Sequence, residues 1–237
     1  NNKINYFKMQ KLTKSGLRAF LAPVNWIIVT GIVFFLSSGQ LNNLRAWIYF
    51  GVYFCGSLVF SFVLLKRSPE LLNSRGKVQE GTKSLDKYLI LSYFFLAIIV
   101  TPLTAGLDVR YNLFMFPFQY IYLAIILYIL SAAFSLWSML HNPFFEGTVR
   151  IQKDRMQNVI KSGPYKFVRH PGYIGMLFGS FPLPFAFGSG LSLIPVLVMV
   201  IIIFVRTSFE DKTLQEELPG YSDYCKEVKY RLIPFLW

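Results

Sequence analysis

Long apolar runs separated by short polar segments dominate the sequence. Four of these runs have the roughly 20 mostly apolar residues that a helix needs to cross a bilayer. They occupy residues 20–38, 46–65, 88–107 and 113–140. We expect each of them to be a transmembrane helix, and the last is long enough to tilt.

Two shorter apolar runs follow at residues 173–187 and 191–205, and prolines interrupt both of them. A Gly-Ser-Gly turn at 188–190 separates the two runs. This pattern favours a tight hairpin of two short spans. The alternative is a re-entrant pair that never fully crosses, since broken helices are tolerated in membranes where they pack on protein or line a cavity.

The predicted fold is therefore an all-α, polytopic membrane protein with about six spans. Residues 1–140 form a first region of four spans. Residues 141–237 form a second region, which consists of a polar connector, the short hairpin and a C-terminal helical tail.

Composition supports a membrane protein. Apolar residues make up 54% of the 237 residues and charged residues only 15%, whereas soluble domains carry about 25% charged residues. A water-soluble enzyme and a disordered chain are both disfavoured. The formal net charge of +12 is compatible with either a nucleic-acid or a membrane partner, so the positions of the charges must decide.

The basic residues are distributed very unevenly. With six alternating spans, 22 of the 24 Lys and Arg residues fall on one side, and only Arg45 and Arg110 on the other. Basic residues mark the cytoplasmic face of a membrane protein, so we expect both termini and the polar segments of residues 141–237 to be cytoplasmic. The net charge is then explained by membrane topology and by contact with lipid headgroups, and a nucleic-acid partner is no longer needed to account for it.

The connector before the hairpin is the first segment that can carry chemistry. Gly163-Pro164 signals a turn, and Pro171 can be the first residue of the next helix. Arg169 and His170 would then lie beside a helix N-terminus, where free N–H groups favour anions. The segment is a plausible cradle for a carboxylate; the alternative is an ordinary basic turn at the membrane surface.

The tail is the second such segment. Residues 206–218 are predicted to continue the last span as a helix that Pro219-Gly220 ends. Arg206 and Glu210 are four residues apart and share one helix face. They form either a solvated surface pair or part of a site. The second alternative draws support from the position next to a membrane exit, where an Arg without a partner is costly.

Other kinds of site find little support. The only histidines are His141 and His170, with no Cys/His cluster, so metal ligation is not expected. There is no glycine-rich phosphate loop, and no Ser/His/Asp set is suggested.

At the connector and the tail, the chain resembles the isoprenylcysteine carboxyl methyltransferase family of integral membrane methyltransferases. The first match, at 163–175, reads GPYKFVRHPGYIG. The second match comprises Arg206, Glu210, Asp211, Leu214, Tyr221, Tyr224, Val228, Arg231 and Pro234. The resemblance covers residues 141–237. Two departures are that Asp211 replaces the second acid of a Glu-Glu pair, and that the His often found before the GPY block is missing.

The resemblance implies that S-adenosylmethionine is the cofactor and that it binds between the connector and the tail. The residues implied in binding it are Gly163, Pro164, Tyr165, Val168, His170, Pro171, Tyr173, Glu210, Tyr221 and Tyr224. The implied catalytic residues are Arg169, Arg206 and Glu210. The two arginines would hold the carboxylate of an acceptor, which is already ionised at neutral pH and needs no general base.

The implied reaction is methylation of a carboxylate on a lipid-like or prenylated acceptor that enters sideways from the bilayer. A phospholipid or amine N-methyltransferase is the main alternative, in which Glu210 would accept a proton. A reductase of sterol-reductase type that uses NADPH, and a non-catalytic receptor or transporter, are less favoured.

Overall fold

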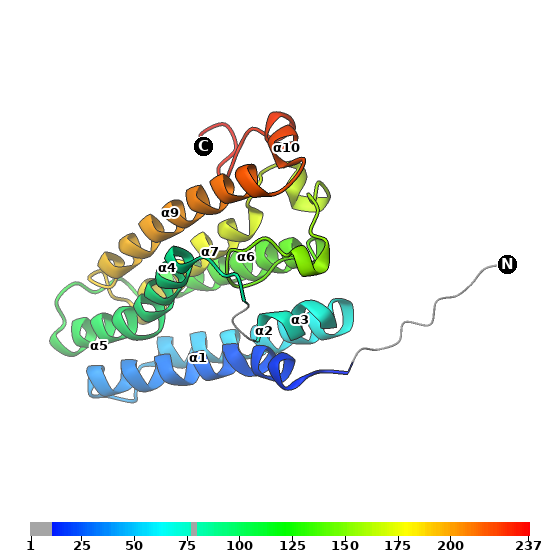
Figure 1. Cartoon of the computed structure of the whole chain (residues 1–237). Helices are drawn as coiled ribbons and strands as arrows, with labels where there is room; N and C mark the ends of the chain where they lie inside the picture. Colours follow the sequence, from blue (N-terminus) through cyan, green and yellow to red (C-terminus); the bar gives the residue numbers. More distant parts are fainter. Residues whose placement is uncertain (1–10, 77–79) are drawn as a thin grey trace.

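Long helices lie side by side in a computed structural model of the chain (Figure 1), which describes residues 11–76 and 80–237. The α-helices are α1 Lys14–Ser38, α2 Leu44–Arg67, α3 Pro69–Arg75, α4 Ser84–Phe95, α5 Thr101–Tyr111, α6 Tyr120–His141, α7 Pro171–Ser180, α8 Pro182–Phe187, α9 Leu193–Glu217 and α10 Tyr221–Glu227. A π-helical segment, η1 Leu96–Val100, joins α4 to α5. Two single 3-10 turns are η2 Lys153–Arg155 and η3 Gly163–Lys166.

Side-chain caps set where the first two long helices begin. The Thr13 hydroxyl accepts a hydrogen bond from the Gly16 amide at 3.1 Å, and Asn43 Oδ1 accepts one from the Ala46 amide at 3.0 Å. Such caps satisfy amides that have no partner inside the helix. Gly39 ends α1 with a positive φ of 69°, a conformation that glycine adopts without steric cost.

Within the described residues, five helices are long and apolar enough to cross a membrane. They are α1, α2, the continuous helix at residues 84–111, α6 and α9. Many of their large apolar side chains are exposed, including Leu36 and Leu91. Such exposure suits a lipid environment and would be unfavourable in water. A polytopic helical membrane protein is therefore confirmed.

The remaining predicted span is divided into two helices, α7 and α8, which are separated at Phe181. Neither is long enough by itself to cross a bilayer. Pro182 and Pro184 lie in the first turn of α8, where a missing N–H is tolerated. The fourth predicted span was placed too early. Residues 113–119 form a loop, and α6 begins only at Tyr120.

That loop binds the hairpin turn at 188–190, where the chain passes from α8 to α9. The Phe116 amide donates to the Gly188 carbonyl at 2.7 Å, and the Gly190 amide donates to the Phe114 carbonyl at 2.8 Å. Asp108 is fully buried beside them and accepts a hydrogen bond from Ser189 Oγ at 2.6 Å.

The start of α7 lies at the other end of α6, because a Cβ atom built on Gly163 would lie 2.4 Å from the His141 ring and one built on Gly172 would lie 2.3 Å from the Phe145 ring. The α7–α8 pair thus runs the length of α6, which supports the hairpin over the re-entrant alternative.

Small residues let α7 lie close against α6. A Cβ atom built on Gly175 would come within 2.2 Å of Ser135 Oγ, and one built on Gly179 within 2.8 Å of Ser131 Oγ. Ser131 Oγ also donates to the Gly175 carbonyl at 2.8 Å. Close approach through glycine and serine is typical of helices that associate in membranes.

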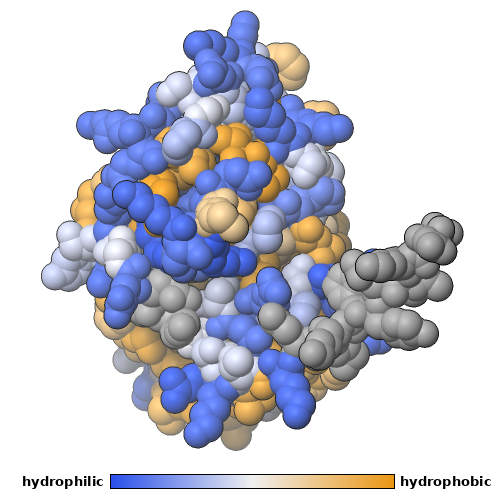
Figure 2. Space-filling model, turned by 45° about the vertical axis from the view of Figure 1, so that its right-hand side comes forward, coloured by the Kyte–Doolittle hydropathy of each residue, from blue (hydrophilic) through white to orange (hydrophobic). Residues whose placement is uncertain are grey.

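The last long helix projects beyond its apolar part, as predicted. It continues to Glu217, and Gly220, with a φ of 80°, turns the chain into α10. This end of the molecule also holds α3 and the 142–170 connector (Figure 1). Figure 2 turns it towards the reader and shows hydrophilic side chains gathered on it.

Candidate functional site

The connector and the tail are bound to each other by backbone hydrogen bonds. The Arg169 amide donates to the Tyr230 carbonyl, and the His170 amide to the Arg231 carbonyl, both at 2.9 Å. Tyr224 adds a hydrogen bond from its hydroxyl to the Tyr165 carbonyl at 2.6 Å. The two segments that carry the sequence motifs therefore form one structural unit.

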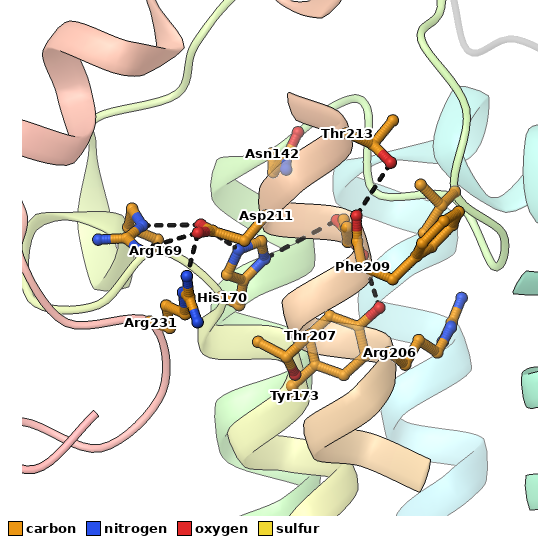
Figure 3. A network of polar contacts seen from close by, with 12 residues as sticks. Asn142, Arg169, His170, Tyr173, Arg206, Thr207, Phe209, Asp211, Thr213 and Arg231 are labelled. Atoms are coloured by element: carbon orange, nitrogen blue, oxygen red, sulfur yellow. Dashed lines mark hydrogen bonds and ion pairs between the residues drawn. The ribbon is translucent and has the colours of Figure 1, made fainter. Parts of the chain in front are cut away.

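Asp211 is the centre of a buried polar network within that unit (Figure 3). Arg169 binds it through two hydrogen bonds, Nε to Oδ1 at 2.8 Å and Nη2 to Oδ2 at 3.0 Å. Arg231 Nε donates to Oδ2 at 2.9 Å, and His170 Nε2 lies 3.0 Å from Oδ1. A buried carboxylate with this many partners is strongly stabilised in its charged form.

The network uses most of the hydrogen-bonding capacity of Arg169. Its remaining terminal nitrogen, Nη1, donates to the Val228 and Lys229 carbonyls at 2.8 Å each. Arg169 thereby joins the connector to the tail, and its charge is balanced by Asp211. In the sequence Asp211 stood out only as a departure from a Glu-Glu pair, and its role as the hub was missed.

Arg206 is also balanced by a carboxylate, but one from the first region. Its Nε donates to Asp86 Oδ1 at 2.6 Å and its Nη2 to Oδ2 at 3.2 Å, while Nη2 also reaches the Gly147 carbonyl at 2.7 Å. The guanidinium lies 5.4 Å from the ring centre of Tyr173. Arg206 is thus not a solvated partner of Glu210, and the buried Asp86 was not predicted.

Glu210 instead faces the connector. Its Oε2 accepts a hydrogen bond from the Tyr173 hydroxyl at 2.5 Å, and its Oε1 lies 3.9 Å from His170 Nδ1. The Glu210 side chain is 28% exposed, whereas that of Asp211 is fully buried. The two adjacent acids therefore differ in kind: Asp211 holds the structure together, and Glu210 presents a carboxylate oxygen to the cavity.

A cavity of about 420 Å³ extends from this site into the helical body. Its polar part is lined by Asn142, Glu146, Gln157, Asn158, Tyr165, His170, Glu210, Tyr221 and Tyr224. Its apolar part is lined by Trp26, Ile90, Tyr93, Phe94, Met139, Gly175, Met176 and Gly179. This volume lies in the range of small-molecule sites, which are about 300–1,000 Å³.

The residues predicted from the motifs divide into two groups. Arg169, Arg206 and six of the ten predicted cofactor residues line the cavity, the six being Tyr165, His170, Tyr173, Glu210, Tyr221 and Tyr224. The other four, Gly163, Pro164, Val168 and Pro171, are not among its lining residues.

Gly163 serves the turn: its φ is 58°, and a Cβ atom there would lie 2.4 Å from the His141 ring. Pro171 occupies the first turn of α7. These residues shape the connector, and their predicted cofactor roles stay predictions.

Several lining residues lie outside the motifs and were missed. Trp26, Arg75 and Phe94 come from the first region, and Asn142 and Glu146 lie at the start of the connector, before its motif. Asn142 Nδ2 donates to the Tyr165 hydroxyl at 3.1 Å. No local sequence signal marks these positions, because each joins the cavity through a contact between distant segments.

The donor and acceptor groups of the polar part suit an amino-acid-derived nucleoside cofactor. Glu210 offers a carboxylate for an ammonium or for ribose hydroxyls, and the side-chain amides of Asn158 and Gln157 can pair with a base. Burial raises the pKa of the hydroxyls of Tyr165 and Tyr221, so both remain protonated at neutral pH. Among the described residues, no group of three or more His, Cys, Asp or Glu side chains could hold a metal ion.

Comparison with known proteins gives one family. A family model described as phospholipid methyltransferase matches residues 119–219, from the start of α6 to the end of α9. No curated protein matches the chain. The matched segment includes the connector, the hairpin and the acids of α9. The match therefore supports a membrane methyltransferase that acts on lipid-like substrates, in the same superfamily as the isoprenylcysteine enzymes.

Proposed function

We propose that this protein transfers a methyl group from S-adenosylmethionine to the amine of a phospholipid-like headgroup. The observation that carries the proposal is the cavity, in which a polar part between connector and tail continues into an apolar part between membrane helices. A water-soluble cofactor and a lipid acceptor can meet in such a space. The phospholipid methyltransferase match over 119–219 supports the same reading.

The charges around the cavity favour an amine over a carboxylate. Arg169 and Arg206, which the motifs suggested for holding a carboxylate, are balanced by Asp211 and Asp86. Glu210 is the carboxylate that reaches the cavity from the tail. A carboxylate next to the reaction centre attracts a cationic headgroup and would repel an anionic one.

The chain's own residues would orient the acceptor and remove a proton. An ammonium must lose a proton before its nitrogen can form the new bond. Glu210 would bind the ammonium and accept that proton, while the Tyr173 hydroxyl holds the carboxylate in place. His170, oriented through its Nε2 by Asp211, turns its Nδ1 towards Glu210 and can relay the proton.

The cofactor, when bound, supplies a methyl group already activated by a positively charged sulfur. The protein's main tasks are therefore orientation and exclusion of water. The aromatic and apolar residues around the inner part of the cavity serve the second task.

Methylation of a carboxylate is the second candidate function. It is supported by the resemblance of the connector and tail to the isoprenylcysteine carboxyl methyltransferases. It requires no general base, and it would leave the His170–Asp211 pair with a purely structural role. Both candidates use the same cofactor and the same lateral approach of a lipid-like acceptor, with the site on the cytoplasmic side.

Equilibrium binding of radiolabelled S-adenosylmethionine to the detergent-solubilised protein tests the proposal. Binding should be saturable, and in Glu210→Gln methyl transfer to an amine should fall about 100-fold or more, because Gln cannot accept the proton. Glu216→Gln is the matched control, because Glu216 is an exposed acid six residues further along α9. Absence of saturable binding to the wild-type protein would refute the proposal.

A second assay distinguishes the acceptors. Phosphatidylethanolamine and a prenylated cysteine are offered side by side with the labelled cofactor, and the methylated products are extracted. Label in the phospholipid alone supports the amine proposal. Label in the prenylated cysteine alone would move the function to the carboxyl class.

A further inference from the structure

Arg75 is a cationic lining residue that neither motif contains. It is the last residue of the short helix α3, and it reaches the cavity from the first region of the chain. It also lies outside the segment that matches the phospholipid methyltransferase family. Its place in the cavity follows from the fold alone.

The other arginines that line the cavity each have an acid partner. Arg150 binds Glu146 through two hydrogen bonds, at 2.8 and 3.0 Å. Arg169 binds Asp211, and Arg206 binds Asp86. Their charges are thus compensated within the protein.

Arg75 differs from them. Among the described residues, its one hydrogen bond runs from Nη1 to the Phe145 carbonyl at 3.1 Å, and its guanidinium lies 5.4 Å from the Phe145 ring centre. Over residues 11–76 and 80–237, no carboxylate lies within 4.0 Å of it. Glu146 interacts electrostatically with Arg75, but both of its carboxylate oxygens already accept hydrogen bonds from Arg150.

The surroundings of Arg75 make this charge unfavourable. Burial, followed by the repulsion of Arg206, lowers the pKa of Arg75 to about 10, so the guanidinium is still charged at neutral pH. Arg75 is half-buried, and over the described part of the chain none of its nitrogens is both enclosed and without a hydrogen-bond partner. Its unpaired N–H groups are therefore open to the cavity, where an anion can pair with them.

We propose that Arg75 binds the phosphate of the acceptor headgroup. This rests on the proposed function, and it specifies the acceptor as an amine lipid that carries a phosphate. The planar fork of an arginine pairs with phosphate oxygens through two parallel hydrogen bonds. Glu210 would then receive the ammonium and Arg75 the phosphate, so the headgroup would lie across the cavity with its charges matched at both ends.

Direct ligand binding tests the assignment without relying on turnover. The full chain is purified in detergent, and the binding of three radiolabelled single-chain lipids is measured: palmitoyl-lysophosphatidylethanolamine, hexadecylamine and hexadecanoate. The variant is Arg75→Gln. The matched control is Arg155→Gln, because Arg155 also lies over a phenylalanine ring, that of Phe144, yet is not among the lining residues of the cavity.

We expect Arg75→Gln to weaken binding of the lysophospholipid about tenfold or more and to change hexadecylamine binding less than about twofold. Arg155→Gln should leave both unchanged, and Arg75→Lys, which keeps the charge, should recover part of the loss. An equal loss for both amines, or no loss for the lysophospholipid, would overturn the assignment. A loss for hexadecanoate alone would also overturn it, in favour of a carboxylate acceptor.

Inorganic phosphate distinguishes a lipid headgroup from a free anion. Competition at a concentration close to that of the lysophospholipid would overturn the lipid assignment, whereas weak competition at millimolar concentration supports it. Cofactor binding is measured in parallel on every variant. Arg75-dependent lipid binding in a protein that does not bind S-adenosylmethionine would refute the proposed function and leave the phosphate site standing.

Discussion

The two regions of the chain contribute to the site in different ways. Residues 141–237 carry every motif and hold themselves together through Asp211, whose main partners all lie in the same region. Residues 1–140 carry no motif, yet they provide Asp86 to Arg206 and place Arg75 and Trp26 in the cavity. On the proposed function, a recognisable sequence marks the part of the site that would bind the cofactor, and the unmarked helices complete the part that would bind the acceptor.

Two buried aspartates of the site, Asp211 and Asp86, illustrate this difference. Asp211 joins the connector to the tail inside one region, whereas Asp86 joins the regions to each other. Removing each in turn should separate local assembly of the site from its attachment to the first helices.

The largest effect is expected for Asp211→Ala. The change leaves Arg169 and Arg231 without their acid, and loss of a buried partner costs about 3–5 kcal/mol. We expect a large fall in the free energy of unfolding together with loss of cofactor binding. Denaturant titration of the solubilised protein measures the first. Asp223→Ala, at an exposed acid of the same tail, is the control, and equal stability of the two variants would contradict the central role of Asp211.

Asp86→Ala should have a somewhat smaller effect, about 3 kcal/mol, because Arg206 keeps the Gly147 carbonyl and the Tyr173 ring. The same titration measures it, with the exposed Asp154→Ala as control. Replacing Asp86 by Leu and Arg206 by Met together should recover much of the stability, since a buried pair can be exchanged for apolar residues at little cost. A double variant as unstable as the single one would argue against this pairing.

Gly175→Ala should cost about 1–3 kcal/mol, the range for overpacked sites. The added methyl group would meet Ser135 Oγ at 2.2 Å and force α7 away from α6. Thermal unfolding checks the prediction. Gly51→Ala provides the comparison, because no atom lies within 4 Å of its Cβ position. If both substitutions are neutral, close packing of α7 on α6 is not needed.

Trp26→Ala should have the smallest effect on stability and should act on the acceptor alone. The ring is 37% exposed and lies 4.7 Å from that of Phe94, beside the apolar part of the cavity. We expect a severalfold change in the KM for a lipid acceptor, with cofactor binding unchanged. Trp47→Ala, at a ring stacked on Phe35 away from the cavity, is the control. A loss of cofactor binding in Trp26→Ala would contradict the proposal that the first region contributes to acceptor binding alone.

Much of the fold was predictable because it depends on local pattern. The long apolar runs gave the membrane helices, and Pro219-Gly220 marked the end of α9. The error at residues 113–119 has a physical cause: the segment is apolar, but the backbone groups of Phe114 and Phe116 pair with the hairpin turn at 188–190 instead of forming a helix.

The site residues were predictable only where they belong to one of the two sequence motifs. Glu210, His170 and Tyr173 were found through their motifs, and all three line the cavity. The partners of the arginines were not found, because Asp86 is 120 positions from Arg206 and Asp211 is 42 positions from Arg169. Which acid neutralises which arginine depends on how the helices pack, and composition and spacing do not reveal it.

The unbroken course of α9 sets the geometry of the whole site. Arg206, which meets the first region, and Glu210, which faces the cavity, stand on one rigid rod about 6 Å apart along its axis. The helix therefore fixes the distance between the contact of Arg206 with the first region and the Glu210 carboxylate that lines the cavity. One residue inserted between them would turn Glu210 by about 100° and advance it by about 1.5 Å, which would move its carboxylate away from the Tyr173 hydroxyl and the cavity.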